Sequence, residues 1–461
     1  MPSFLSTHPE QRFRRSWQAL QIGLLLLPLS PFLGGLGAIA ATVLVWRQQF
    51  SSLIGSRLNQ LLGVWLILLM VSAATAIDPQ AAGLRIFNFL PFILVFAAGS
   101  RLIQTPDQLR QISWISAIAS IPVVLIGIGQ MYSGWHGPIA LGPIVNWSLP
   151  AGGIPPDRMA SVFGYANTLA CYSAIVFLLA LALWIETHWQ LSELTPNLFE
   201  TRVARNLYRR SRLLLGILVG HTIVLVSTAS RNAWAIVVLG CLVYAIYLGW
   251  RLLVAAVTAM TGLVLAAAFA PSPVNLWLRT MVPAYFWARL TDELYSDRPL
   301  AQFRRTQWAF ASQLTLDRPG TGWGLGSFTP LYEQKMQLWL GHPHSLFLML
   351  SAETGLPATL LLVGIVGWTI FQGFKTWHRW LPNSPAHPDL ELVTPDGKET
   401  LDTDRRSDRL LLLSYLITFG AVSFFHCLDV PLFDARINLL GWLLLAAIWG
   451  VANRQQGSWG K

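Results

Sequence analysis

Residues 252–270 read LLVAAVTAMTGLVLAAAFA, a run of 19 residues without a charge. A helix needs about 20 predominantly apolar residues to cross the hydrocarbon core of a bilayer, so this run is long enough to span a membrane. Similar runs recur along the whole chain. They predict twelve spans, at residues 17–30, 33–46, 60–77, 84–99, 112–131, 164–185, 213–228, 233–249, 252–270, 345–372, 410–427 and 436–453.

The composition agrees with a membrane protein. Of the 461 residues, 54% are hydrophobic and 12% are charged. A typical soluble domain carries about 25% charged residues, so this composition excludes a soluble enzyme and a disordered chain. The three cysteines form no Cys-x-x-Cys pair, which argues against a zinc site or a disulfide framework. We therefore predict an all-α polytopic membrane protein, with residues 1–461 forming a single transmembrane domain.

The distribution of basic residues predicts the topology. The net charge of +10 comes mainly from short segments between apolar runs, which is a topology signal and not a nucleic-acid-binding face. With both termini cytoplasmic, 21 of the 32 basic residues lie on the inner side. The short outer connections then carry only Arg85, Arg158, Arg231 and Arg436. Dropping one of the first two spans would leave the N-terminal arginines outside. Pro28, Pro31 and the glycines at 34–35 favour a helical hairpin there over a signal peptide or one long span.

Two connecting segments are long. Residues 373–409 are rich in Pro, Asp, Thr and Arg without apolar periodicity, which predicts a flexible cytoplasmic loop. Residues 271–344 contain many Trp, Tyr and Phe side chains. Trp and Tyr favour the headgroup level of a bilayer. This segment is therefore predicted to be a folded extracytoplasmic loop, or lid, that lies along the membrane between the ninth and tenth spans.

The turn at residues 228–234 (TASRNAW) holds the first candidate site residues. Arg231 lies at the outer membrane surface, on the side that the positive-inside rule disfavours for arginine. The neighbouring hydroxyl of Ser230 makes an anion-binding turn plausible. The alternative is an arginine that extends its side chain to the lipid headgroups without a further role.

A second candidate lies in the lid. Arg304 and Arg305 precede Trp308, and a glycine-rich run follows at residues 319–326 (PGTGWGLG). A guanidinium group presents a rigid fork that fits phosphate oxygens. No strand leads into the glycine run, so it does not predict a nucleotide site. We interpret it as a turn whose backbone approaches the membrane closely.

The third candidate closes the lid. His342 and His344 flank Pro343, and Ser345 follows at the mouth of the tenth span. Histidine accepts protons near neutral pH, so either ring could act as a base. Two histidines could also be half of a metal site, but no acidic or cysteine cluster lies close in the sequence to complete it, and we expect no metal. Two carboxylates in a neighbouring outer turn could orient an imidazole, Asp429 and Asp434.

Three motifs together resemble a known family. His344-Ser345, followed after nine residues by Gly355-Leu356-Pro357-Ala358, is similar to the His-Ser/Asn-x9-Gly-x-x-Gly pattern of the O-antigen ligase and polymerase superfamily, with Ala358 in place of the last glycine. The segment 230–234 resembles that family's Ser-Arg-Gly-x-Trp turn, with Asn232 at the glycine position. Arg304, Trp308 and residues 319–324 match its Arg-x3-Trp and Pro-x-x-Gly-x-Gly segment. Residues 163–170 (FGYANTLA) are a weaker echo of a Gly-Asn-Pro-Asn-x-x-Ala stretch.

The resemblance implies a GT-C-like membrane glycosyltransferase in the bacterial cytoplasmic (inner) membrane. Such enzymes transfer a glycan from a polyprenyl-diphosphate carrier to an acceptor hydroxyl, on a lipid or a glycan, in the biosynthesis of lipopolysaccharide and related polysaccharides, without a metal, nucleotide or other cofactor. By this resemblance His344, Arg231 and Arg304 are catalytic, and Arg231, Arg304 and Arg305 bind the diphosphate. The supporting residues would be Ser230, Ser345, His342, Asp429 and Asp434.

The superfamily leaves two alternatives open. One is an O-antigen polymerase. The other is transport of inorganic carbon, because the Phe303-Arg304 segment and residues 429–436 (DVPLFDAR) also resemble a cyanobacterial-type branch classed as bicarbonate transporters. A transporter needs charged pairs or interrupted helices near the middle of the bilayer. The sequence shows only His221 there, which favours the enzyme.

Overall fold

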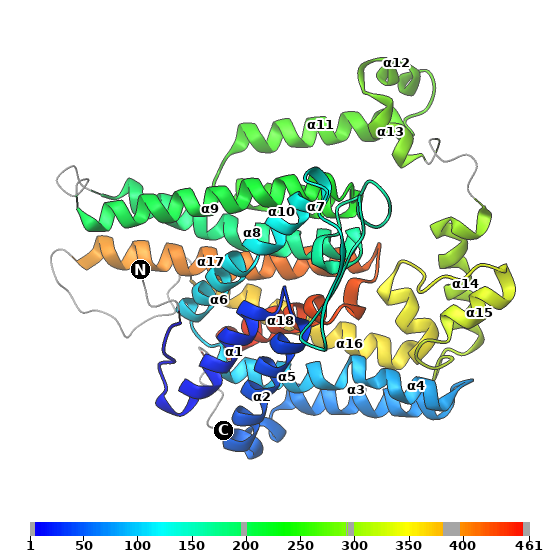
Figure 1. The fold of residues 1–461 in the computed structure, drawn as a ribbon, viewed down its shortest axis with the longest axis horizontal. Coiled ribbons are helices and arrows are strands. Elements are labelled where there is room, and N and C mark those ends of the chain that lie inside the picture. The colour runs from blue at the N-terminus through cyan, green and yellow to red at the C-terminus, as the bar shows by residue number, and fades with distance from the viewer. Residues whose placement is uncertain (1–4, 195–200, 292, 294–298, 381–396, 455–461) are drawn as a thin grey trace.

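The computed structural model describes residues 5–194, 201–291, 293, 299–380 and 397–454. It is a bundle of helices with one small β-hairpin (Figure 1). The first half of the chain forms α1 (Arg14–Leu26), α2 (Pro31–Ile54), α3 (Arg57–Ala74), α4 (Pro79–Arg85), α5 (Leu90–Leu102), α6 (Pro106–Ala119), α7 (Ile121–Tyr132), β1 (Gly137–Leu141), β2 (Val145–Leu149) and α8 (Ala166–Ser192). The two strands pair antiparallel, with Gly137 opposite Leu149.

The second half contains the lid and the last long helices. Its helices are α9 (Arg202–Ser227), α10 (Arg231–Tyr247), α11 (Arg251–Phe269), α12 (Val274–Met281), α13 (Ala284–Leu290), α14 (Arg304–Asp317), α15 (Phe328–Met336), α16 (Leu346–Arg379), α17 (Gly397–His426) and α18 (Ala435–Arg454). Short 3₁₀ turns at 11–13, 86–88, 161–163, 300–302 and 431–433 lie between them.

Several helices begin where a proline follows a capping side chain. Ser30 accepts a hydrogen bond from the backbone N–H of Leu33 at the start of α2, and Thr105 forms a capping box with Gln108 at the start of α6. The break between α1 and α2 confirms the predicted hairpin. The two helices pack closely because a side chain at Gly37 would come within 2.5 Å of the Cα of Gly23.

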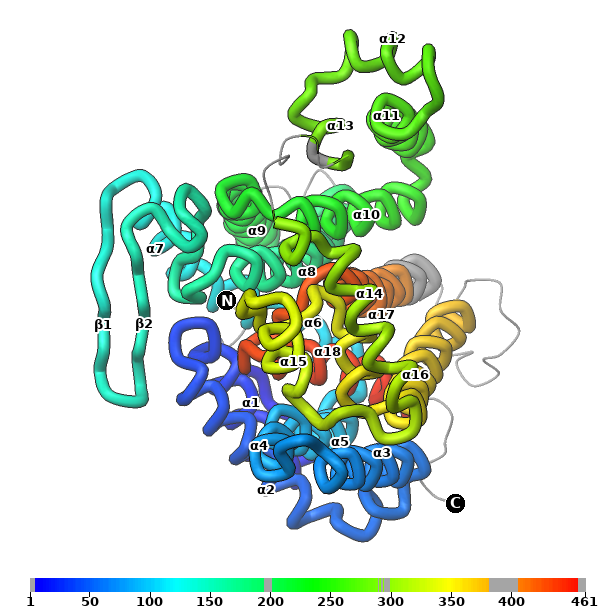
Figure 2. The backbone as a smooth tube through the Cα atoms, turned by 90° about the vertical axis from the view of Figure 1, so that its right-hand side faces the viewer, coloured from blue at the N-terminus to red at the C-terminus, as the bar shows by residue number. Residues whose placement is uncertain are grey.

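Within the described ranges, nine helical segments are long and apolar enough to cross a membrane. The chain is therefore a multi-pass helical membrane protein. Each of the twelve predicted spans contains a helix, but α1, α2 and α10 are not among the nine segments, so the number twelve stays a prediction. α18 and α8 form the centre of the bundle, because 89% and 78% of the residues in their most apolar 18-residue stretches are buried. The value for α11 is 11%, and α11 lies away from the bundle together with α12 and α13 (Figures 1 and 2).

The two long segments contain more helix than connecting loops usually do. Four short helices, α12 to α15, lie within the predicted lid at 271–344. α14 and α15 pack on the beginning of α16 through an aromatic cluster of Phe310, Phe328 and Tyr332. In the predicted loop at 373–409, α16 continues to Arg379 and α17 begins at Gly397, so helix enters it from both ends, and residues 381–396 lie outside the described residues.

The glycine-rich run closely approaches the backbone of α16, a contact that the sequence did not predict. Gly322 has a φ of +67°, and a Cβ there would lie 2.5 Å from the Glu353 carbonyl. Backbone hydrogen bonds join Trp323 N–H to Ala352 and Gly324 N–H to Glu353. These contacts fall at the kink of α16, where Gly355 is non-helical with a φ of +79°. The run thus attaches the lid to the kinked helix.

We expect Gly322→Ala to destabilise this attachment. Its side chain would be strained by the positive φ and would collide with Glu353, which together should cost about 1–3 kcal/mol. Thermal unfolding of the detergent-solubilised protein measures this loss. Gly320→Ala is the matched control, because no atom lies within 4 Å of a Cβ there. Equal midpoints for the two variants would contradict the proposed contact.

The predicted topology can be tested at Lys335 in α15. A cysteine at Lys335 should react with a membrane-impermeant thiol reagent added from outside, because we expect the lid to be extracytoplasmic. A cysteine at Asn206, an exposed position near the start of α9, should react only after the membrane is permeabilised. Labelling of Lys335→Cys only from the cytoplasmic side would overturn the topology.

Candidate active site

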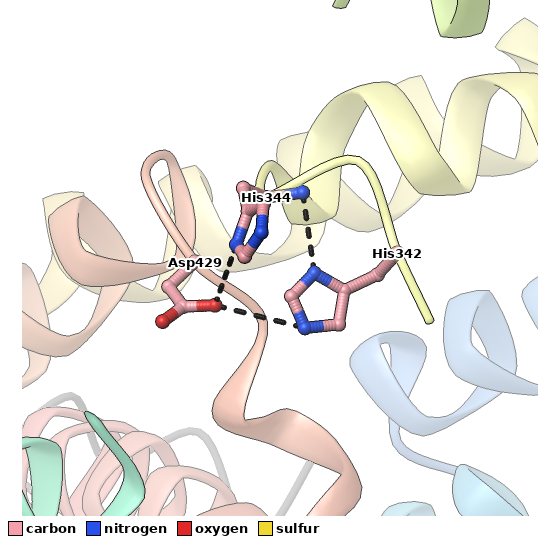
Figure 3. Close-up of side chains that lie close together, drawn as sticks. All are labelled: His342, His344 and Asp429. Carbon is pink, nitrogen blue, oxygen red and sulfur yellow. Dashed lines mark hydrogen bonds and ion pairs between the residues drawn. The ribbon is translucent and has the colours of Figure 1, made fainter. Parts of the chain in front are cut away.

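Two histidines and one aspartate from distant segments meet at one end of the bundle (Figure 3). His342 and His344 lie in the loop before α16, and Asp429 lies in the turn after α17. His344 Nδ1 is 3.2 Å from Asp429 Oδ1, and His342 Nε2 is 3.6 Å from the same oxygen. The backbone N–H of His344 donates to His342 Nδ1 at 3.2 Å. Asp429 therefore orients an imidazole, as one of the two carboxylates was expected to.

The local backbone fixes the two rings. His344 has a φ of +51°, in the left-handed region that few non-glycine residues adopt, although His is enriched among them. Pro343 restricts the neighbouring peptide. The imidazoles stand nearly perpendicular, with centroids 4.7 Å apart. Exchange of the two rings would require this strained loop to refold.

Burial and neighbouring charges shift the pKa values of Asp429 and His342. Burial acts to raise the pKa of Asp429, but the hydrogen bond from His344, the two imidazoles and the Val430 N–H lower it to about 2. Burial lowers the pKa of His342 to about 4; the Asp429 charge opposes this shift, whereas His344 and Arg304 add to it. At neutral pH Asp429 is thus a carboxylate and His342 is neutral.

A chain of hydrogen bonds extends from the carboxylate into the bundle. Asn167, in the first turn of α8, donates to Asp429 Oδ2 at 2.6 Å. Its amide oxygen accepts from Arg158 Nη2 at 2.6 Å, and Arg158 Nε donates to the Thr228 carbonyl at 2.7 Å. The aspartate is therefore linked to the turn that precedes Arg231.

That turn also touches the aspartate loop directly. Asn232 donates to the Leu428 carbonyl at 3.3 Å, so the residues next to Arg231 and next to Asp429 are in contact. Arg231 is the first residue of α10, and Ser230 is its buried N-cap. Arg304 begins α14, and its charge acts on both His342 and Tyr165. The structure thus brings the 228–232 turn and the histidine loop to the Asp429 loop, with Arg304 near enough for its charge to act on His342.

The remaining predicted residues lie at the edge of this cluster or outside it. Ser345 is the buried N-cap of α16, and Arg305 is exposed in the first turn of α14. Asp434 does not approach an imidazole. It forms an ion pair with Arg436 at 2.5 Å, and the Arg436 guanidinium also lies over the Phe163 ring.

A carboxylate does approach the two histidines, so the reason for expecting no metal there was wrong. It rested on the lack of a carboxylate near the histidines in the sequence, but Asp429 reaches them from 85 residues away. One ligand atom from each of His342, His344 and Asp429 lies within 4.8 Å of the others. This donor set has the composition of known divalent-metal sites.

Sequence reasoning missed Asn167 and Arg158 as members of the site. Two signals for them were present. Asn167 lies in the 163–170 stretch that weakly echoes the family, and Arg158 is one of the few basic residues on the expected outer side. Neither signal indicates a contact with Asp429, because that contact depends on how α8 packs beside α17.

Two polar groups inside the bundle bear on the choice between enzyme and transporter. His221 is buried, with Nδ1 2.6 Å from Ser173 and Nε2 2.9 Å from Ser120, as expected for a packed contact. The structure also contains a charged pair that the sequence analysis did not find. Arg110 bonds to buried Glu186 at 2.8 Å, at the opposite ends of α6 and α8 from the histidines.

An apolar cavity of about 310 Å³ begins beside the site. It lies between α16, α17 and α18, and Leu346 and Leu432 line it next to the histidine and aspartate loops. His426 Nε2 and Asn438 Oδ1, two buried acceptors without a partner among the described residues, belong to residues of its wall. The rest of the wall is almost wholly apolar, so the cavity could hold a hydrocarbon chain next to the polar cluster.

A comparison with known protein families matches part of the chain. Residues 213–363 match a family model described as O-antigen ligase. No curated protein is significantly similar to the chain. The matched range runs from α9 to the middle of α16 and contains all three motifs that carried the resemblance. Residues 213–363 of this membrane protein thus form a region of the O-antigen ligase family, whose glycan-transferring enzymes act on glycan and lipid substrates.

Proposed function

We propose that the protein is an O-antigen ligase-type glycosyltransferase on the outer face of the bacterial cytoplasmic membrane. It transfers a glycan from a polyprenyl-diphosphate carrier to the hydroxyl of a lipid or glycan acceptor, without a metal or another cofactor in the reaction. The observation that carries this proposal is the pairing of His344 with buried Asp429, next to an apolar cavity and within the influence of the Arg304 charge, which acts on His342.

His344 is the proposed general base. Asp429 accepts a hydrogen bond from Nδ1–H, which leaves the lone pair on Nε2 and holds the ring in one orientation. Nε2 takes the proton of the acceptor hydroxyl as its oxygen attacks the anomeric carbon of the donor. The bond between that carbon and the diphosphate oxygen breaks, and its electron pair leaves with the carrier.

The arginines act on the leaving group. Charge grows on the diphosphate as the glycosidic bond breaks, and preorganised guanidinium groups stabilise that charge. Arg304 and Arg231 are the proposed ligands, and Arg305, in the same helical turn as Arg304, is the third. Arg158 has a different task, because its Nε and Nη2 hydrogen bonds hold Asn167 and the 228 turn in place.

The cavity is the proposed site for part of the lipid chain. Its wall is almost wholly apolar, and Phe347 and Val363 on α16 are exposed at its edge, so a chain could enter from the bilayer. The lid at 271–344, outside the membrane, would then bind the acceptor. Both termini and the 373–409 segment are proposed to be cytoplasmic.

We expect His344→Ala to reduce glycan transfer by about 10²- to 10⁴-fold, the usual effect of losing a general base. Donor binding should persist, because the arginines remain. The measurement is the transfer rate of purified protein with a polyprenyl-diphosphate-linked glycan. His342→Ala should cost far less, since only His344 holds its Nδ1 at 3.2 Å from Asp429.

Full transfer by His344→Ala would overturn the assignment of the base. Deletion of the protein should change the surface polysaccharide of the cell. Unchanged glycans together with impaired uptake of inorganic carbon would favour the transporter alternative, and loss of chain extension alone would favour a polymerase.

The cavity predicts a separate effect on the lipid substrate. A Cβ at Gly441 of α18 has no atom within 4 Å, so Gly441→Leu should fold and fill the cavity. If the new side chain displaces two methylene groups, at about 0.8 kcal/mol each, the KM for the donor should rise roughly tenfold. Steady-state kinetics with a long-chain donor measures it.

Gly364→Leu is the matched control, because Gly364 is equally open and does not line the cavity. With a donor whose lipid is shortened to a few carbons, the two variants should have the same KM. A Gly441→Leu protein with an unchanged KM for the long-chain donor would show that the chain binds elsewhere.

A further inference from the structure

We propose that His342, His344 and Asp429 bind a single divalent transition-metal ion, for which Zn²⁺ is the probe, and that the bound ion stops glycan transfer. The binding half of this proposal depends only on the geometry of the three side chains. The inhibitory half rests on the proposed function, in which His344 is the base.

The three donors already lie close to metal-binding distances. Zn–N and Zn–O bonds of about 2.0–2.1 Å in a tetrahedral site place ligand atoms about 3.3 Å apart. His344 Nδ1 and His342 Nε2 are 3.2 and 3.6 Å from Asp429 Oδ1, and all three ligand atoms lie within 4.8 Å of one another. The two histidine–aspartate distances thus already fit one ion, and the two imidazole nitrogens, at most 4.8 Å apart, would have to move toward each other by side-chain rotation.

The type of donor selects the type of ion. Two imidazoles and one carboxylate suit Zn²⁺, Co²⁺ or Ni²⁺, whereas Mg²⁺ and Ca²⁺ prefer sites made of oxygen ligands. Three protein ligands leave a fourth position for water, so the site remains open on one side. The side chains of His342 and His344 are 23% and 25% exposed, which gives an ion a path to them.

Neighbouring groups both support the site and limit its affinity. Asn167 donates to Asp429 Oδ2, the carboxylate oxygen that does not face the imidazoles, and so holds Oδ1 toward them. The Val430 N–H also donates to Oδ1 at 2.9 Å. The positive charge of Arg304 acts on His342 and opposes a dication. We therefore expect weaker binding than at a structural zinc site.

Metal binding would change the tautomer of the base. In the base form that the proposed function requires, the single ring proton of His344 is on Nδ1, bonded to Asp429, and Nε2 can accept a proton. An ion on Nδ1 uses that lone pair, so the ring proton must be on Nε2. Nε2 is then a donor and cannot take the proton of the acceptor hydroxyl. His342 must change in the same way, because its Nδ1 accepts a hydrogen bond from the His344 N–H. When Nε2 binds the ion, the ring proton of His342 must be on Nδ1, and that hydrogen bond is lost. No proton is gained or lost in either exchange.

Binding is tested on the purified full-length protein in detergent. Calorimetric titration with Zn²⁺, and the visible absorption spectrum with Co²⁺, should both give one ion per chain. His342→Ala should weaken Zn²⁺ binding at least about 10-fold, the lower end of the loss seen when support of a metal site is removed. His136→Ala is the control, because His136 is an exposed histidine in the β-hairpin region with a bond to the Gly134 carbonyl.

The second measurement is the ratio of transfer rates with and without Zn²⁺, taken within each variant. The ratio should fall steeply for the wild type and for His136→Ala, recover on chelation, and stay near one for His342→Ala at the same Zn²⁺ concentration. Binding that His342→Ala does not weaken would overturn the site. Faster transfer with Zn²⁺ would overturn the inhibition. A protein that binds one Zn²⁺ but transfers no glycan would refute the proposed function and leave the metal site standing.

Discussion

The buried carboxylate of Asp429 is the point on which the arrangement of this site depends. A charge in a poorly solvated position is costly unless hydrogen bonds and opposite charges surround it. Asp429 receives them from the histidine loop, from Asn167 at the start of α8 and from its own Val430 N–H. Removing one partner of such a group typically costs about 3–5 kcal/mol. The need to satisfy one carboxylate therefore holds together segments that lie far apart in the sequence.

The lid is held by a different constraint, the close approach of backbones. The glycine run at 319–326 packs against the kink of α16 at Gly355, and side chains at these positions would collide with the opposite backbone. The histidine loop connects α15, which packs within the lid, to the first residue of α16. His344, with its strained φ, lies on the short segment that joins the lid to α16. Displacement of the lid would therefore move the base.

Sequence patterns predicted the features that local chemistry determines. Runs of apolar residues located every long helix, and the prolines at 28 and 31 located the turn between α1 and α2. Short motifs identified Arg231, Arg304 and His344, and the family match supports their setting. The contacts of Asp429 could not be predicted in the same way. Its bonds to His344 and Asn167 join residues 85 and 262 positions apart, and they depend on how α8, α16 and α17 pack. The same limit explains why the sequence suggested that no carboxylate lies near the two histidines. It also explains why Asp434 was expected to orient an imidazole, although it pairs with Arg436 two residues away.

The family match ends at residue 363, although the carboxylate and its supporting groups lie beyond it on both sides. Arg158 and Asn167 precede the matched range, and Asp429 follows it. The histidine itself lies inside the matched range, but the residues that orient its ring lie outside it. A relative can therefore keep every motif of the matched range and still lack the acceptor that fixes the imidazole tautomer. In such a protein another oxygen would have to take the Nδ1 proton, or the same histidine would present its opposite nitrogen to the substrate. Equivalent motifs would then belong to chemically different sites.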